Sequence, residues 1–262
     1  MRRGRGSGDG LTDPDDLDGD KMETGAARLV VGCAGLPVQR QAYGGMLSAI
    51  ELREAQAQPP GAKAARSWRE ELGACAVALP AWQLVCGEPV GTGFRGVQKA
   101  IEPGHLGRYG AFHDTQEVRD AFGATRVAAD ALNARVIVFN CGASFTPTVE
   151  NEARMRKFFE STPRDGRTFA LSLRGVWEAS RVSELAHAMD VVPVTDPLDD
   201  EAPTVDGPFA YFQLPGPVMG RYRYNDDDLD ALRARCDDFD EAWCICAGPA
   251  MWAEARSFTK RV

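Results

Sequence analysis

From residue 27 onward the sequence alternates between short apolar stretches typical of buried strands and longer amphipathic stretches typical of helices. The clearest strand is ARVIVFN, residues 134–140, and the clearest helix is residues 114–132, with Asp114 as its expected N-cap. The other predicted strands are residues 27–33, 48–52, 74–82, 167–174, 190–195, 208–214 and 241–247, and the other predicted helices are 62–72, 148–160, 181–189, 226–236 and 250–260. Eight strands, nearly all separated by helices, predict a single-domain parallel (β/α)8 barrel of the TIM type over residues 28–262, since about 250 residues is typical of that fold.

An open, doubly wound sheet is the alternative architecture. Its support is the string GTGFRG, residues 91–96, which fits the G-x-G-x-x-G pattern of dinucleotide-binding turns. No predicted strand leads directly into this string, and the residues after it are a poor start for a helix. The barrel is therefore the favoured prediction.

The amino-acid composition indicates which kinds of partner and which cellular compartment to expect. The net charge of −8 argues against nucleic acid, because binding to a phosphate backbone relies on Lys and Arg. No apolar run approaches the roughly 20 residues of a membrane helix, and residues 1–27 are rich in Gly and Asp, which indicates a disordered tail and not a signal peptide. Met22 is a second possible start. Seven cysteines, an odd number, favour reduced thiols in a cytoplasm.

Several strings at the predicted strand ends resemble one known family. They are VGCAGLP (31–37), IEL (50–52), AWQ (81–83), ASFTPTVEN (143–151), LRGVW (173–177), VTDP (194–197) and YRYNDDDL (222–229). Their order and spacing are similar to domain-of-unknown-function family 72, also called the YecE-like family, and to its archaeal-type branch in particular. The resemblance runs from about Leu29 to Phe258. It implies a TIM-barrel fold, and it implies no particular reaction.

Departures from the family pattern concern groups that could carry a proton. Where the family has Lys, His, Glu, Arg, His and an Asn–Asn pair, this chain has, in order, Pro80, Gly87, Ser172, Gln213, Pro215, Ala247 and Gly248. Acid–base chemistry at the strand ends of a barrel needs titratable groups. The resemblance therefore favours a degenerate, rather apolar site in a protein that binds a small molecule or a partner, or in a pseudoenzyme. The alternative is an enzyme that uses Glu51, Arg174 and Asp196 on a phosphorylated or carboxylated molecule.

Glu51 and Asp196, both at predicted strand ends, are the candidate catalytic residues. Either carboxylate could act as a base. The competing interpretation is structural: both side chains could accept hydrogen bonds from loop amides, with Asp196 held in a turn by Pro197. We expect them to be occupied by backbone amides or by Arg174.

Candidate ligand-binding residues surround the same predicted strand ends. Arg174 together with Arg221 or Arg223 could hold an anionic small molecule, or these arginines could only tie loops together. Trp82 and Trp177 could stack on a planar ligand or plug the core. Asn140, at the end of the strand 134–140, completes the set.

Metals and cofactors are not indicated. Metal-ligand spacing is missing from the sequence, and the three histidines, His105, His113 and His187, are expected on the surface. The cysteines at predicted strand ends could form a soft-metal or reactive-thiol site if they faced one mouth, but they also suit a barrel core; they are Cys33, Cys86, Cys141 and Cys246. The cofactor, the substrate and the oligomeric state are not fixed by the sequence.

Overall fold

The computed structural model describes residues 27–88, 94, 96–216 and 223–261. Its eight parallel strands pair in chain order, and the last pairs with the first, so the sheet is a closed barrel. The strands are β1 (Arg28–Ala34), β2 (Ala49–Glu51), β3 (Ala76–Pro80), β4 (Val136–Cys141), β5 (Thr168–Leu173), β6 (Val192–Thr195), β7 (Phe209–Leu214) and β8 (Glu241–Cys246). The predicted TIM-type barrel is confirmed, and the open-sheet alternative is wrong.

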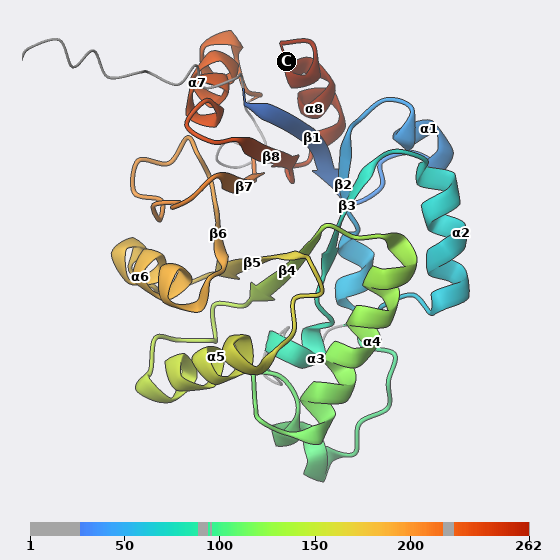
Figure 1. The fold of residues 1–262 in the computed structure, drawn as a ribbon, viewed down its shortest axis with the longest axis vertical. Coiled ribbons are helices and arrows are strands. Elements are labelled where there is room, and N and C mark those ends of the chain that lie inside the picture. Colours follow the sequence, from blue (N-terminus) through green and yellow to red (C-terminus); the bar gives the residue numbers. More distant parts are fainter. Residues whose placement is uncertain (1–26, 89–93, 95, 217–222, 262) are drawn as a thin grey trace, which may run out of the picture.

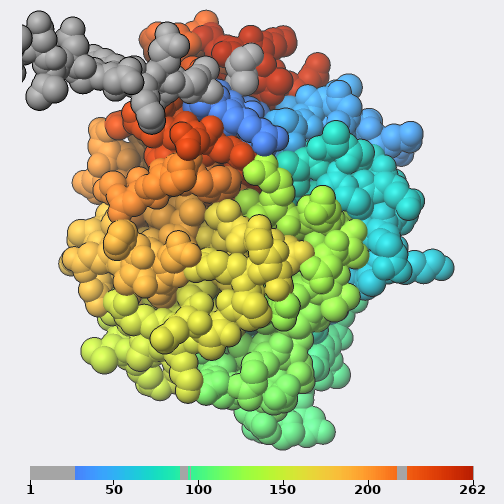
Figure 2. All heavy atoms as spheres, viewed as in Figure 1, coloured from blue at the N-terminus to red at the C-terminus, as the bar shows by residue number. Residues whose placement is uncertain are grey.

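Helices surround the barrel (Figure 1). They are α1 (Arg40–Gly44), α2 (Ala62–Leu72), α3 (Gln83–Cys86), α4 (Gln116–Leu132), α5 (Val149–Ser161), α6 (Ala179–Met189), α7 (Asp226–Cys236) and α8 (Met251–Thr259), with two short 3-10 helices, η1 (Arg53–Gln56) and η2 (Pro103–Arg108). The first and last coloured parts of the chain lie side by side, as the pairing of β1 with β8 requires (Figure 2). Among the described helices, none is long and apolar enough to cross a membrane.

Strand alternation separates two apolar layers. Inward side chains such as Val138, Tyr211 and Trp243 fill the barrel, while their neighbours pack against the helices. Gly32 of β1 lies close to β2: a Cβ there would be 2.2 Å from the carbonyl oxygen of Ala49. The inward alternation matters for function because the last inward residue of each strand faces the mouth of the barrel.

Two local expectations differ from the structure. The N-cap of α4 is Thr115, whose hydroxyl accepts a hydrogen bond from the Val118 amide, and not Asp114. Asp114 instead pairs with Arg119 and Lys157 on the surface. The short helix α1 was not expected from the sequence. The predicted tail, residues 1–27, lies outside the described residues except for residue 27, and so does most of GTGFRG, residues 91–93 and 95.

Candidate functional site

A polar cavity of about 280 Å³ lies at the carboxyl ends of β2, β4 and β5. This is the end of a TIM barrel at which active sites are found. Its polar and charged lining comes from three loops and strand ends: Glu51, Arg53, Gln56, Asn140 and Arg174, with Cys141 and Gly142 completing the wall. We call this candidate site the mouth cavity.

Glu51 is the buried acid of the mouth cavity. It is the last residue of β2, and alternation turns it inward like Ala49, while Ile50 packs among the helices. Only 1 % of the residue is exposed. Its Oε2 accepts hydrogen bonds from the Tyr211 hydroxyl at 2.8 Å and from Gln213 Nε2 at 3.2 Å, both from β7. Its Oε1 is buried and has no hydrogen-bond partner among the described residues.

Gln213 connects this acid to an arginine. Nη2 of Arg174 lies 3.5 Å from Oε1 of Gln213, a weak contact that favours the amide orientation in which Nε2 faces Glu51. Because an amide has one donor end and one acceptor end, Gln213 can join a cation and a carboxylate without a direct salt bridge. The strand β7 thus contributes the groups that orient Glu51, although its tip carries no charge.

The pKa of Glu51 is raised above its ordinary value. Burial is the largest cause, because it removes water from the charged form, and hydrogen bonds from Tyr211 and Gln213 and the charges of Arg53 and Arg174 oppose it only in part. Burial likewise raises the pKa of Tyr211, and the neighbouring Glu51 adds to that shift. In the folded protein Glu51 therefore binds its proton more tightly than an exposed glutamate does.

Two arginines give the mouth cavity positive charge. Arg53 follows β2 and Arg174 follows β5, and both side chains are exposed. Within the described part of the chain neither forms a salt bridge, whereas most other arginines are paired with Asp or Glu. Their guanidinium groups are available for a bidentate contact with a carboxylate or phosphate.

Asp196 does not join Glu51. Its Oδ1 accepts a hydrogen bond of 3.0 Å from the Leu198 amide, which makes the turn after β6. The residue lines a different, more acidic cavity beside α7 with Asp199 and Asp238. Burial raises its pKa, and the Leu198 bond lowers it. The two candidate carboxylates therefore do not converge on one point.

The two tryptophans make structural contacts. Trp82 is buried, and its indole Nε1 donates to the carbonyl of Ala57 at 2.9 Å. Trp177 donates to the carbonyl of Phe145 at 2.6 Å and stacks on the Phe145 ring. Neither ring lines the mouth cavity.

The remaining candidates lie elsewhere or outside the described residues. Arg221 belongs to residues 217–222, which are not described; Arg223 is exposed and acts electrostatically on Glu254. The four candidate cysteines pack in the helix-facing layer, where Cys33 contacts the carbonyl of Met251 and Cys86 that of Asn140. Of the four, Cys141 also lines the mouth cavity. Over the described ranges, no group of three or more His, Cys, Asp or Glu side chains could hold a metal ion.

The mouth is charged, contrary to the expectation of an apolar, stripped site. Ser172 and Gln213 are buried polar residues. Gly87 follows α3 and lies against Gly110, where a Cβ would be 1.8 Å from the Gly87 carbonyl oxygen. The substitutions predicted to empty the site therefore do not surround one apolar opening, and Arg53, which sequence reasoning missed, adds charge instead.

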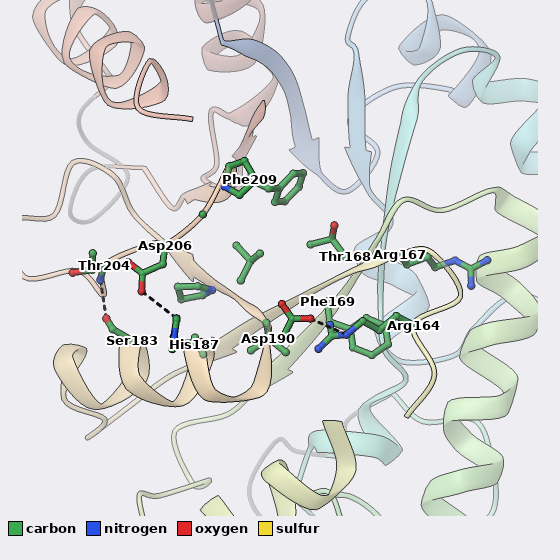
Figure 3. Close-up of a pocket in the computed structure, with 16 residues that line it drawn as sticks. Arg164, Arg167, Thr168, Phe169, Ser183, His187, Asp190, Thr204, Asp206 and Phe209 are labelled. Carbon is green, nitrogen blue, oxygen red and sulfur yellow. Dashed lines mark hydrogen bonds and ion pairs between the residues drawn. The ribbon is translucent and has the colours of Figure 1, made fainter. Parts of the chain in front are cut away.

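A larger cavity of about 450 Å³ lies at the opposite end of the strands (Figure 3). It is lined by the starts of β5, β6 and β7, including Phe169 and Phe209, and by α6. Its polar groups already have partners within the protein: Arg164 pairs with Asp190, and Nδ1 of His187 lies 3.7 Å from Oδ2 of Asp206. Because these groups already have partners and the amino end of barrel strands serves stability, the mouth cavity is the better candidate site.

Sequence reasoning also missed Gln56, Tyr211 and the role of Gln213. Arg53 had a usable signal, since it follows Glu51 by two residues at the same strand end. Tyr211 and Gln213 had a weaker one: they alternate along a strand and so share a face. Which face was inward, and which acid they met, was not readable from β7 alone.

Comparison with known proteins finds likeness at the level of structure. No family model matches the sequence, and no curated protein matches it. A DUF72 family protein from Enterococcus faecalis superposes with a TM-score of 0.62 at 15% identity, over 90% of this chain and 97% of its own. A DUF72 family protein from Thermotoga maritima gives 0.64 at 13% identity, over 89% and 98%. A D-psicose 3-epimerase gives 0.54 at 12% identity, over 85% and 90%.

At these identities the superpositions show a shared fold. The two DUF72 structures are matched over almost their whole length, which agrees with the strand-end motifs found in the sequence. This chain therefore shares the fold of these DUF72 family proteins.

Proposed function

We propose that the protein binds a small anionic molecule in the mouth cavity. The observation that carries this proposal is the placement of Arg53 and Arg174, which lack a salt bridge to any described residue, beside the buried Glu51 in a cavity of about 280 Å³. Small-molecule sites have volumes of about 300–1,000 Å³, so this one suits a compact ligand. A carboxylate or phosphate would supply the charge that the two guanidinium groups lack.

Acid–base catalysis at the same cavity is the second candidate function. It is favoured by the raised pKa of Glu51 and by its Oε1, which has no hydrogen-bond partner among the residues that the structure describes. A catalytic version of the site would use Glu51 with Arg174 and would not include Asp196, which lines another cavity.

Thermal unfolding in the presence of inorganic phosphate tests the binding proposal. A ligand that binds only the folded state raises Tm by mass action, with about 2.7 kcal/mol of stabilisation at a hundred times Kd. Arg174→Ala and Arg53→Ala should each reduce the shift strongly. Arg66→Ala, an exposed arginine on the outer side of α2, is the matched control and should respond as the wild type does.

Sodium chloride at equal ionic strength controls for ionic strength. Phosphate also stabilises proteins by exclusion from their surface, and the comparison between the wild type and the variants controls for this effect because exclusion acts on all of them alike. Equal phosphate shifts in the wild type and in all three variants would overturn the proposal.

A further inference from the structure

Besides the two arginines, two residues that line the mouth cavity each carry a buried hydrogen-bond acceptor. Oε1 of Glu51 and Oδ1 of Asn140 are both buried, and neither has a partner among the described residues. Both residues line the cavity. A buried acceptor without a partner is costly, so a ligand that donates to these two oxygens gains more than one that covers them with carbon.

The orientation of the Glu51 carboxylate, and with it the position of Oε1, is fixed by the contacts of its other oxygen. Its other oxygen already accepts from Tyr211 and Gln213, and the contact of Arg174 with Gln213 favours the amide orientation that makes the second of these bonds. The acceptor and the anion-binding arginine are therefore connected through one side chain. A ligand that uses both sites would therefore carry its hydrogen-bond donor, which meets Glu51, close to its anionic group, which meets Arg174.

The chemistry of the donor can be narrowed. An ammonium group would be repelled by Arg53 and Arg174, which line the same cavity. A hydroxyl group is neutral, and it can donate to an ionised Glu51 or accept from a protonated one. The volume of about 280 Å³ equals that of about nine water molecules at ~30 Å³ each, so the ligand is small.

We infer that the ligand is a small hydroxylated anion, such as a hydroxy acid or a polyol phosphate, whose hydroxyl groups are recognised by Glu51 and Asn140. This inference rests on the proposed function and names its substrate class. Arg53 and Arg174 hold the anionic group, and Glu51 and Asn140 select molecules that carry hydroxyl groups next to it. A deoxy analogue leaves both acceptors without a hydrogen bond, so it gains less on binding.

Titration calorimetry with matched pairs of probes tests this selection. Glycerol 3-phosphate is compared with propyl phosphate, and glycerate with propanoate, so that charge is constant within a pair while the hydroxyl groups differ. The wild type should bind each hydroxylated probe at least about tenfold more tightly than its deoxy partner, as hydrogen bonds to a charged group require. The comparison between pairs shows whether phosphate or carboxylate is preferred.

Single-residue variants separate the contribution of hydroxyl recognition from that of anion binding. Asn140→Ala should bring the ratio within each pair toward one while inorganic phosphate binds as before. Arg174→Ala should weaken all four probes. Ser172→Ala is the control: Ser172 pairs with Asn140 in the sheet but lies outside the cavity lining, and its ratios should match the wild type.

The outcomes distinguish the two proposals. If phosphate and both phosphate esters bind but the members of each pair bind equally, hydroxyl recognition is wrong and the anion site stands. If none of the probes binds, the proposed function fails and this inference fails with it.

Discussion

Replacing Glu51 with glutamine should change how stability depends on pH. Glutamine keeps the shape of the side chain and an oxygen that can accept from Tyr211 and Gln213, but it removes the charge. In the wild type, burial raises the folded-state pKa of Glu51 above 4.5. The folded state therefore holds this proton more tightly than the unfolded state does, and stability present below pH 4.5 is lost as the pH rises through the folded pKa.

The magnitude follows from proton linkage. Over the interval between 4.5 and the folded pKa, each pH unit costs the wild type up to about 1.4 kcal/mol that the variant does not lose. Urea unfolding followed by tryptophan fluorescence at pH 5, 6, 7 and 8 measures both proteins. Glu51→Gln should gain stability relative to the wild type as the pH rises.

The difference between the two proteins isolates Glu51, because Asp196 and Glu254, whose pKa values burial also raises, are the same in both. Glu70→Gln, at an exposed position of α2, is the control for removing a glutamate charge. A constant difference between wild type and Glu51→Gln from pH 5 to pH 8 would refute the reasoning, since it would mean that folding does not change the proton affinity of this carboxyl group.

Two further predictions concern packing. Trp82→Phe should lower the free energy of unfolding by about 1 kcal/mol, because it removes the indole bond to the Ala57 carbonyl while keeping a ring, and it should leave phosphate binding unchanged; loss of the phosphate-induced Tm shift would instead place Trp82 in the site. Gly32→Ala should destabilise the protein by about 1–3 kcal/mol, because its methyl group would meet the Ala49 carbonyl. Gly123→Ala in α4, where a Cβ meets nothing within 4 Å, should stabilise the protein by up to about 1 kcal/mol. Urea unfolding measures both glycine variants, and a Gly32→Ala variant more stable than Gly123→Ala would contradict the prediction that β1 and β2 leave no room for a methyl group at Gly32.

Much of the fold was predictable because its signals are local. Helix α7 begins at Asp226 and ends at Cys236, as its apolar spacing predicted, and its N-cap Asn225 forms a capping box with Asp228. Each predicted strand lies within two residues of its observed bounds, because each is an apolar stretch between turn residues. The helix α1 was missed because five residues are too few to show a helical period.

The candidate site was predictable only in part. Glu51, Asn140 and Arg174 were named from the sequence, and the structure brings all three to one cavity. Asp196 stood at an equally suitable strand end and belongs to another cavity, because the turn closed by the Leu198 amide directs it away. Strand ends identify candidates, but the direction of each side chain depends on the loop that follows the strand.

The sequence by itself determined the alternation of strands and helices, and with it the barrel, because periods of 2 and 3.6 residues are properties of each segment alone. Only the tertiary structure decided which acid is buried, which side chains hold it, and which of its oxygens has no partner within the described ranges. Tyr211 lies 160 residues after Glu51 in the chain, and the closure of the barrel brings β7 across from β2 so that the two side chains meet inside it. That contact depends on the register of all eight strands together, which no single segment contains.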